Sequence, residues 1–122
     1  MAATYAQRMA LGAYGERLAV QALERSGLRI LDRNWRSAHG EIDIVAGIGR
    51  LLVVCEVKTR RGDRYGTPLE AITVEKAARL YRLGAAWAAA HGVSYGRLRV
   101  DVVAVRLSRR GGRRVEHIAG VC

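Results

Sequence analysis

Two short runs of apolar and β-branched residues, separated by a glycine-containing turn, constrain the fold of this chain most. Residues 41–46 and 51–58 each have the length of a strand, and Gly47 and Gly49 lie between them. Runs of this kind that are only a few residues apart pair as an antiparallel hairpin. The sequence therefore predicts a β-hairpin, around which the rest of the chain has to be arranged.

Periodicity and turn signals predict further elements on both sides of this hairpin. We expect helices over about residues 4–26 and 73–91, and strands over 28–35, 97–107 and 113–118. Loops are predicted over residues 36–40 and 59–68. The second helix should bury Leu80, Leu83, Trp87 and Ala90. The order α-β-β-β-α-β-β predicts an α/β (α+β) fold in which helices flank a mixed central sheet.

Length and charge narrow the classes of function. A chain of 122 residues fits a single domain, here 1–122. Its 21 basic and 11 acidic residues give a net charge of +10, which points to a polyanionic partner. Nucleic acid is the first expectation, DNA ahead of RNA, and an anionic membrane surface is the second. The alternative is that the basic residues only solvate the surface.

The sequence also predicts a cytoplasmic protein. Its two cysteines, Cys55 and Cys122, lack the spacing of a zinc or redox motif, and no signal peptide is recognised. The longest uncharged stretch, residues 83–96, is too short to span a bilayer, so no membrane partner is expected.

The predicted hairpin carries charged residues within apolar strands. Asp43 lies in its first strand, and Glu56 and Lys58 lie two residues apart, on one face of its second strand. Burial of a carboxylate is costly unless it gains a partner. We therefore expect two carboxylates and one ammonium group to gather at the end of an apolar sheet.

Two clustered carboxylates are ligands that Mg²⁺ or Mn²⁺ accepts together with water. Asp43 and Glu56 are the predicted ligands, and the backbone carbonyl of Val57 could supply a third. Lys58 would orient or deprotonate an attacking water. The alternative is a structural ion pair between Glu56 and Lys58, with Asp43 satisfied by backbone groups.

The sequence resembles the YraN-like family of small bacterial proteins over nearly its whole length. The segments that carry the resemblance are Gly15-Glu16, Arg33-Asn34-Trp35-Arg36, Gly40-Glu41-Ile42-Asp43 and Glu56-Val57-Lys58-Thr59-Arg60. That family is similar to the restriction-endonuclease-like, or PD-(D/E)xK, nucleases, which include archaeal Holliday junction resolvases. The resemblance implies a restriction-endonuclease-like fold and a nuclease site.

The functional residues of that superfamily carry over to four positions. Its first metal-binding aspartate matches Asp43, and the acid and lysine of its second motif match Glu56 and Lys58. The helical glutamate that assists the metal in some members matches Glu16, which borders the apolar face of the first helix. One departure is Ile42, which stands where the superfamily motif has proline.

Arginines flank the predicted site along the sequence. Those expected to contact phosphates are Arg33, Arg36, Arg60, Arg61 and Arg64. Asp101 is expected to be a satisfied structural acid. Glu41 is expected either close to the site or on its rim with a basic partner, and Trp35 in the core, with stacking on a base as the alternative.

These observations support three hypotheses. The first is a metal-dependent endonuclease that hydrolyses DNA phosphodiester bonds, with branched or damaged DNA as candidate substrates. The second is a non-catalytic nucleic-acid-binding module on a nuclease fold, and the third is a basic protein-interaction domain. A homodimer stays an open alternative, because symmetric cutting of two strands requires two sites.

Overall fold

The computed structural model describes residues 3–62 and 72–121, and its element order agrees with the sequence prediction. The elements are α1 (Tyr5–Arg25), β1 (Arg29–Ser37), β2 (Gly40–Ile48), β3 (Leu51–Arg61), α2 (Val74–His91), β4 (Arg97–Leu107) and β5 (Arg113–Ile118). Threonine side chains cap both helices. Thr4 accepts a hydrogen bond from the Gln7 amide, and Thr73 accepts one from the Lys76 amide.

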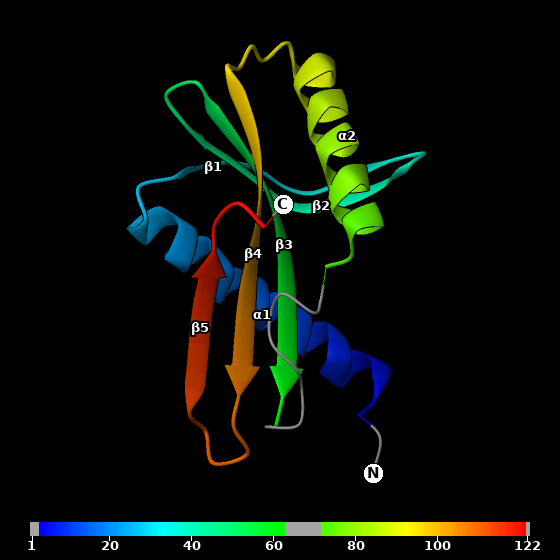
Figure 1. Ribbon diagram of the computed structural model, residues 1–122. Coiled ribbons are helices and arrows are strands. Elements are labelled where there is room, and N and C mark those ends of the chain that lie inside the picture. The colour runs from blue at the N-terminus through cyan, green and yellow to red at the C-terminus, as the bar shows by residue number, and fades with distance from the viewer. Residues whose placement is uncertain (1–2, 63–71, 122) are drawn as a thin grey trace.

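A five-stranded mixed sheet, in the order β1-β2-β3-β4-β5, forms the centre of the fold (Figure 1). Neighbouring strands are antiparallel except β3 and β4, which run parallel over their whole length. Parallel neighbours need a crossover connection, and α2 lies in that connection. The predicted mixed sheet with flanking helices is confirmed.

Two apolar clusters lie on opposite faces of this sheet. The cluster beneath α1 includes Leu18, Leu23, Ile44, Val53 and Cys55, all buried. The cluster beneath α2 includes Val45, Leu52, Val54, Leu83 and Trp87. Alternate residues of β3 thus enter different clusters, as the two-residue period of a strand requires. The predicted buried face of α2 is confirmed except at Ala90, which is exposed.

A glycine on each helix allows close packing against β3. A Cβ atom at Gly15 of α1 would lie 1.8 Å from the Thr59 hydroxyl oxygen. A Cβ atom at Gly84 of α2 would lie 2.6 Å from a methyl carbon of Val54. Both distances are far below van der Waals contact, so only glycine leaves room for the strand at these two positions.

Strand ends differ from the prediction mainly at β3. It continues to Arg61 instead of ending at Lys58, so Arg60 and Arg61 lie on a strand and not in the predicted loop. The parallel ladder with β4 explains this extension, because it runs from Leu51↔Arg97 to Arg61↔Leu107. Residues 63–68 of the predicted loop, which include Arg64, lie outside the described residues.

Asp101 is a satisfied structural acid, as predicted. Its carboxylate is fully buried and accepts two hydrogen bonds from Arg99, and it lies 2.7 Å from a ring nitrogen of His117. The Gly120 amide also donates to it. Burial alone would raise the pKa of Asp101, but these partners outweigh it and lower the pKa. The network ties the C-terminal segment to β4.

Within residues 3–62 and 72–121, neither helix combines the length and the apolar composition that crossing a bilayer requires.

We expect opposite effects from alanine at two glycines of α1. Gly15→Ala should lower the free energy of unfolding by about 2 kcal/mol, because the new methyl group overlaps Thr59. Gly12→Ala should raise it by about 0.5 kcal/mol, because nothing lies within 4 Å and alanine favours helix. Urea denaturation of both variants measures the difference. Equal effects of the two substitutions would contradict the close packing of α1 on β3.

Candidate functional site

The candidate site lies where β2 separates from β3. The two strands pair only from Ile44↔Cys55 to Ile48↔Leu51. Beyond this point β2 follows β1 toward α2, where Gly40 lies close to Leu83 (Figure 1). The carboxylate of Asp43 stands in the opening and accepts a hydrogen bond from the Val57 amide at 2.8 Å. This side chain therefore bridges two strands whose backbones have ceased to pair.

The regular alternation of β2 is broken at the same place. Ile44 packs in the cluster beneath α1, but Ile42 packs in the cluster beneath α2, with Trp35 at its edge. Regular two-residue alternation would place Ile42 and Ile44 on one face of β2, and the structure departs from it here. On the paired strand, Asn34 has a φ of 54°, a left-handed conformation that asparagine tolerates. Both strands change direction here, a feature that two-residue periodicity could not reveal.

This backbone change brings Arg33 and Asn34 to one carboxylate of α1. Arg33 Nε lies 3.1 Å from an oxygen of Glu16, and the Asn34 amide donates to the same carboxylate at 3.1 and 3.3 Å. Gly15 holds this part of α1 against β3. The Gly15-Glu16 and Arg33-Asn34-Trp35 segments therefore form one polar contact on the α1 side of Asp43.

Glu56 carries a second polar contact on the opposite side. One of its oxygens lies 3.4 Å from the ammonium nitrogen of Lys58 and 3.4 Å from that of Lys76. The predicted Glu56–Lys58 pair is thus present, and α2 adds a second cation. Lys58 and Lys76 are the two lysines of the sequence, and all the other residues counted as Lys or Arg are arginines. Sequence reasoning missed Lys76, although its rarity was a usable signal.

Asp43 differs from both acids because no cation in the part of the chain that the structure describes balances its charge. Within residues 3–62 and 72–121, no Lys, Arg or His side chain lies within ion-pair distance of its carboxylate. Burial, and then repulsion from Glu56, Glu16 and Glu41, raise the pKa of Asp43 to about 6, although the Val57 amide opposes the shift. The folded protein therefore holds a destabilised carboxylate at neutral pH.

The pKa of Lys58 is shifted in the opposite direction to that of Asp43. Burial and the neighbouring Lys76 lower its pKa, and Glu56 only partly restores it. A lysine with a lowered pKa gives up its proton more readily than an exposed one, so it can exchange protons with a nearby water.

The donor atoms suit a hard divalent cation with several water ligands. Asp43 and Glu56 supply carboxylate oxygens that repel each other, and a cation between them would relieve the repulsion. The N–H and C=O of a strand residue point to the same side, so we expect the Val57 carbonyl to face the opening with its amide. The described residues contain no group of three His, Cys, Asp or Glu side chains arranged for a metal. Backbone and water would complete the coordination.

The predicted phosphate-contacting arginines fall into two regions. Arg33 is paired with Glu16, and Arg36 is paired with Glu41 at 3.3 Å in an exposed contact. Of the two positions expected for Glu41, the exposed pair with Arg36 agrees with the rim. Arg60 and Arg61 lie exposed at the end of β3, and Arg64 lies outside the described residues.

Comparison with known proteins places the chain in a family. The model of the uncharacterised protein family UPF0102 matches residues 15–105. The chain belongs to UPF0102. This confirms the resemblance to the YraN-like family predicted from the motifs, and the match begins at Gly15 and includes every predicted site residue.

Similar UPF0102 proteins match this chain over nearly its whole length. A UPF0102 protein of Kineococcus radiotolerans is 58% identical over 92% of this chain and 93% of its own length. One from Nocardioides sp. is 50% identical over 98% of this chain and 96% of its own length. Another, from Streptomyces coelicolor, is 51% identical over 93% of this chain and 89% of its own length. None of these names states an activity, so function has to be argued from the site.

The electrostatics of Asp43 predict a stabilising substitution. The folded-state pKa lies above the ordinary value of 3.8, so ionised Asp43 destabilises the fold increasingly between pH 3.8 and about 6, and fully above that range. Asp43→Asn keeps an oxygen for the Val57 amide and should raise the unfolding free energy by about 2 kcal/mol at pH 7.5 without divalent cations.

The pH dependence provides the control for this prediction. Near pH 4 the gain should largely disappear, because Asp43 is then protonated in the folded protein. Glu41→Gln removes an exposed acid of the same strand and should change stability by less than about 0.5 kcal/mol. Urea denaturation at both pH values measures these effects. A loss of stability in Asp43→Asn at pH 7.5 would contradict the destabilised carboxylate.

Proposed function

We propose that this UPF0102 protein is a metal-dependent endonuclease that hydrolyses phosphodiester bonds of DNA. The observation that carries the proposal is Asp43, a largely buried carboxylate with acidic neighbours and no basic partner among residues 3–62 and 72–121. A purely structural acid would be expected to resemble Asp101, which is surrounded by donors. A perturbed group beside further charged residues is characteristic of a functional site.

Each residue of the site has a proposed role. Asp43, Glu56 and the Val57 carbonyl would hold Mg²⁺ or Mn²⁺, which would polarise the phosphoryl group and lower the pKa of a bound water. Lys58, with its lowered pKa, would take or hold a proton of the attacking water. Lys76 would release Glu56 when the cation binds, and then remain available for charge on the phosphate.

Glu16 is proposed as a positioning residue. It is held by Arg33 and Asn34 and acts on Asp43 through charge. This arrangement agrees with the assisting role that the nuclease resemblance implies for the helical glutamate. The same resemblance supports a restriction-endonuclease-like relationship for the fold, with a mixed sheet between helices.

A second candidate function is a nucleic-acid-binding module without catalysis. The observation that favours it is that Glu56 forms two ion pairs. One of its oxygens lies 3.4 Å from the ammonium nitrogen of Lys58 and 3.4 Å from that of Lys76. If those ion pairs persisted, the carboxylate would be a poor cation ligand. The net charge of +10 would still support binding to a polyanion.

A cleavage assay distinguishes these functions. Purified protein is incubated with single-stranded, duplex, flapped and four-way-junction DNA, and with matched RNA, in Mg²⁺, Mn²⁺ or EDTA. We expect cleavage with a divalent cation and none in EDTA. Asp43→Asn and Lys58→Met should each reduce the rate at least about 100-fold. Glu41→Gln should retain activity, because this acid is exposed and paired with Arg36.

Two outcomes would overturn the nuclease proposal. Cleavage that persists in both Asp43→Asn and Lys58→Met would place the chemistry elsewhere or indicate a contaminating enzyme. Salt-dependent binding without cleavage of any substrate in either metal would favour the binding module. The substrate panel also determines whether DNA or RNA, and which structure, is preferred.

A further inference from the structure

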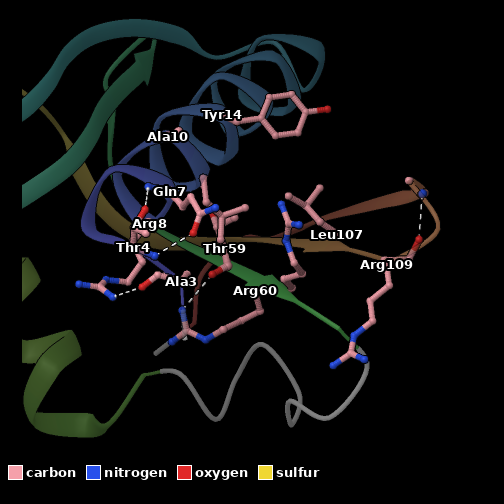
Figure 2. A pocket seen from close by; sticks show the side chains of 15 residues that line it. Ala3, Thr4, Gln7, Arg8, Ala10, Tyr14, Thr59, Arg60, Leu107 and Arg109 are labelled. Atoms are coloured by element: carbon pink, nitrogen blue, oxygen red, sulfur yellow. Dashed lines mark hydrogen bonds between the residues drawn. The ribbon is translucent and has the colours of Figure 1, made fainter. Parts of the chain in front are cut away.

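A basic groove lies next to the candidate site, at the carboxyl end of β3. Its volume is about 1160 Å³, and its walls come from the N-terminal half of α1, the end of β3 and the β4–β5 turn (Figure 2). Arg8, Arg60, Arg61 and Arg109 line it, and no aspartate or glutamate occurs among the described residues of its lining. The groove therefore gathers positive charge from three elements that are distant in sequence.

The start of α1 adds to this charge. Thr4 and Gln7 line the groove, and the first turn of α1 contains no acidic residue. The amino end of a helix carries a partial positive charge and favours anions. Here it lies beside exposed arginines, so helix and side chains attract the same kind of ligand.

The course of β3 connects this groove to the candidate site. Lys58 belongs to the site, and the next three residues along the strand, Thr59 to Arg61, line the groove. At a rise of about 3.3 Å per residue, Lys58 and Arg61 are about 10 Å apart. Each strand of duplex DNA carries one phosphate for about every 3.4 Å of helix axis, so a path of this length spans only a few phosphates.

Within residues 3–62 and 72–121, one edge of β3 has no strand partner along this path. On its β2 side, the strand pairs only as far as Cys55, because β2 has already turned toward α2. No other described strand pairs with that edge beyond this point. Among the described residues, this unpaired stretch of β3 therefore connects Asp43 with the α1 face, where Thr59 packs against Gly15.

We propose that this groove binds the phosphodiester backbone of the single DNA strand that leaves the Asp43 site. The inference deepens the proposed function and rests on it for the identity of the ligand. Tyr14 forms one wall, with its hydroxyl held by Arg113 and its ring 5.7 Å from the guanidinium carbon of Arg17. A positive groove that contains an aromatic wall is typical of surfaces that follow a single strand.

The experiment compares two triple variants with equal charge. The groove variant is Arg8→Ala/Arg61→Ala/Arg109→Ala. The control variant is Arg25→Ala/Arg29→Ala/Arg97→Ala, which removes three exposed arginines outside the groove lining. Fluorescence anisotropy with a fluorescein-labelled single-stranded DNA oligonucleotide, in EDTA and at several salt concentrations, measures affinity without cleavage. Circular dichroism verifies that both variants are folded.

We expect the groove variant to bind at least about 10-fold more weakly than the wild type, and the control variant less than about 3-fold. The slope of log affinity against log salt should fall by about 2 in the groove variant, because each lost phosphate contact contributes about 0.7 on a single strand. Equal weakening in the two variants would overturn the proposal. Competition by polyglutamate as strong as by unlabelled DNA would also overturn it, and would assign the groove to an acidic protein.

Failure of this inference can be distinguished from failure of the proposed function. If Asp43→Asn abolishes cleavage while the groove variant binds like the control, the nuclease proposal stands and the groove proposal falls. If no substrate is cleaved but binding depends on the groove arginines, the groove proposal stands for the binding module.

Discussion

The hydrogen bond from the Val57 amide to Asp43 is the interaction on which the candidate site depends. It occurs where β2 separates from β3, so a side chain takes the place of a lost backbone pair. The same separation leaves one edge of β3 without a strand partner among the described residues, and Asp43 is repelled by both Glu16 and Glu56. The bond therefore keeps a carboxylate in a position that charge alone would disfavour.

The two helices position the charges around this carboxylate through close packing on β3. Gly15 lets α1 approach Thr59 and brings Glu16 toward Asp43, and Gly84 lets α2 approach Val54 on the opposite face. The N-terminal turn of α2 then places Lys76 beside Glu56. The pKa shift of Asp43 and the proposed cation site therefore both depend on the packing of the two helices against β3. Displacement of either helix would move the charges that surround Asp43.

Most of the fold could be predicted from the sequence, because each element has a strong local signal. The periodic apolar residues and glycine turns placed both helices and all five strands in the correct order. Asp43, Glu56 and Lys58 were predicted as neighbours from hairpin geometry. Non-local effects could not be predicted. The position of Lys76 depends on how α2 packs, the side change of Ile42 coincides with the left-handed backbone of Asn34, and the extension of β3 depends on β4.

The most direct test of the account is a Mn²⁺ titration followed by electron paramagnetic resonance, with wild type, Asp43→Asn and Glu41→Gln at pH 8 and pH 5. The account predicts one site in the wild type and in Glu41→Gln. This site should be weakened at least about 10-fold in Asp43→Asn, and weakened at pH 5, where the proton competes for a carboxyl whose pKa is about 6. Equal Mn²⁺ affinity in Asp43→Asn and the wild type would contradict it.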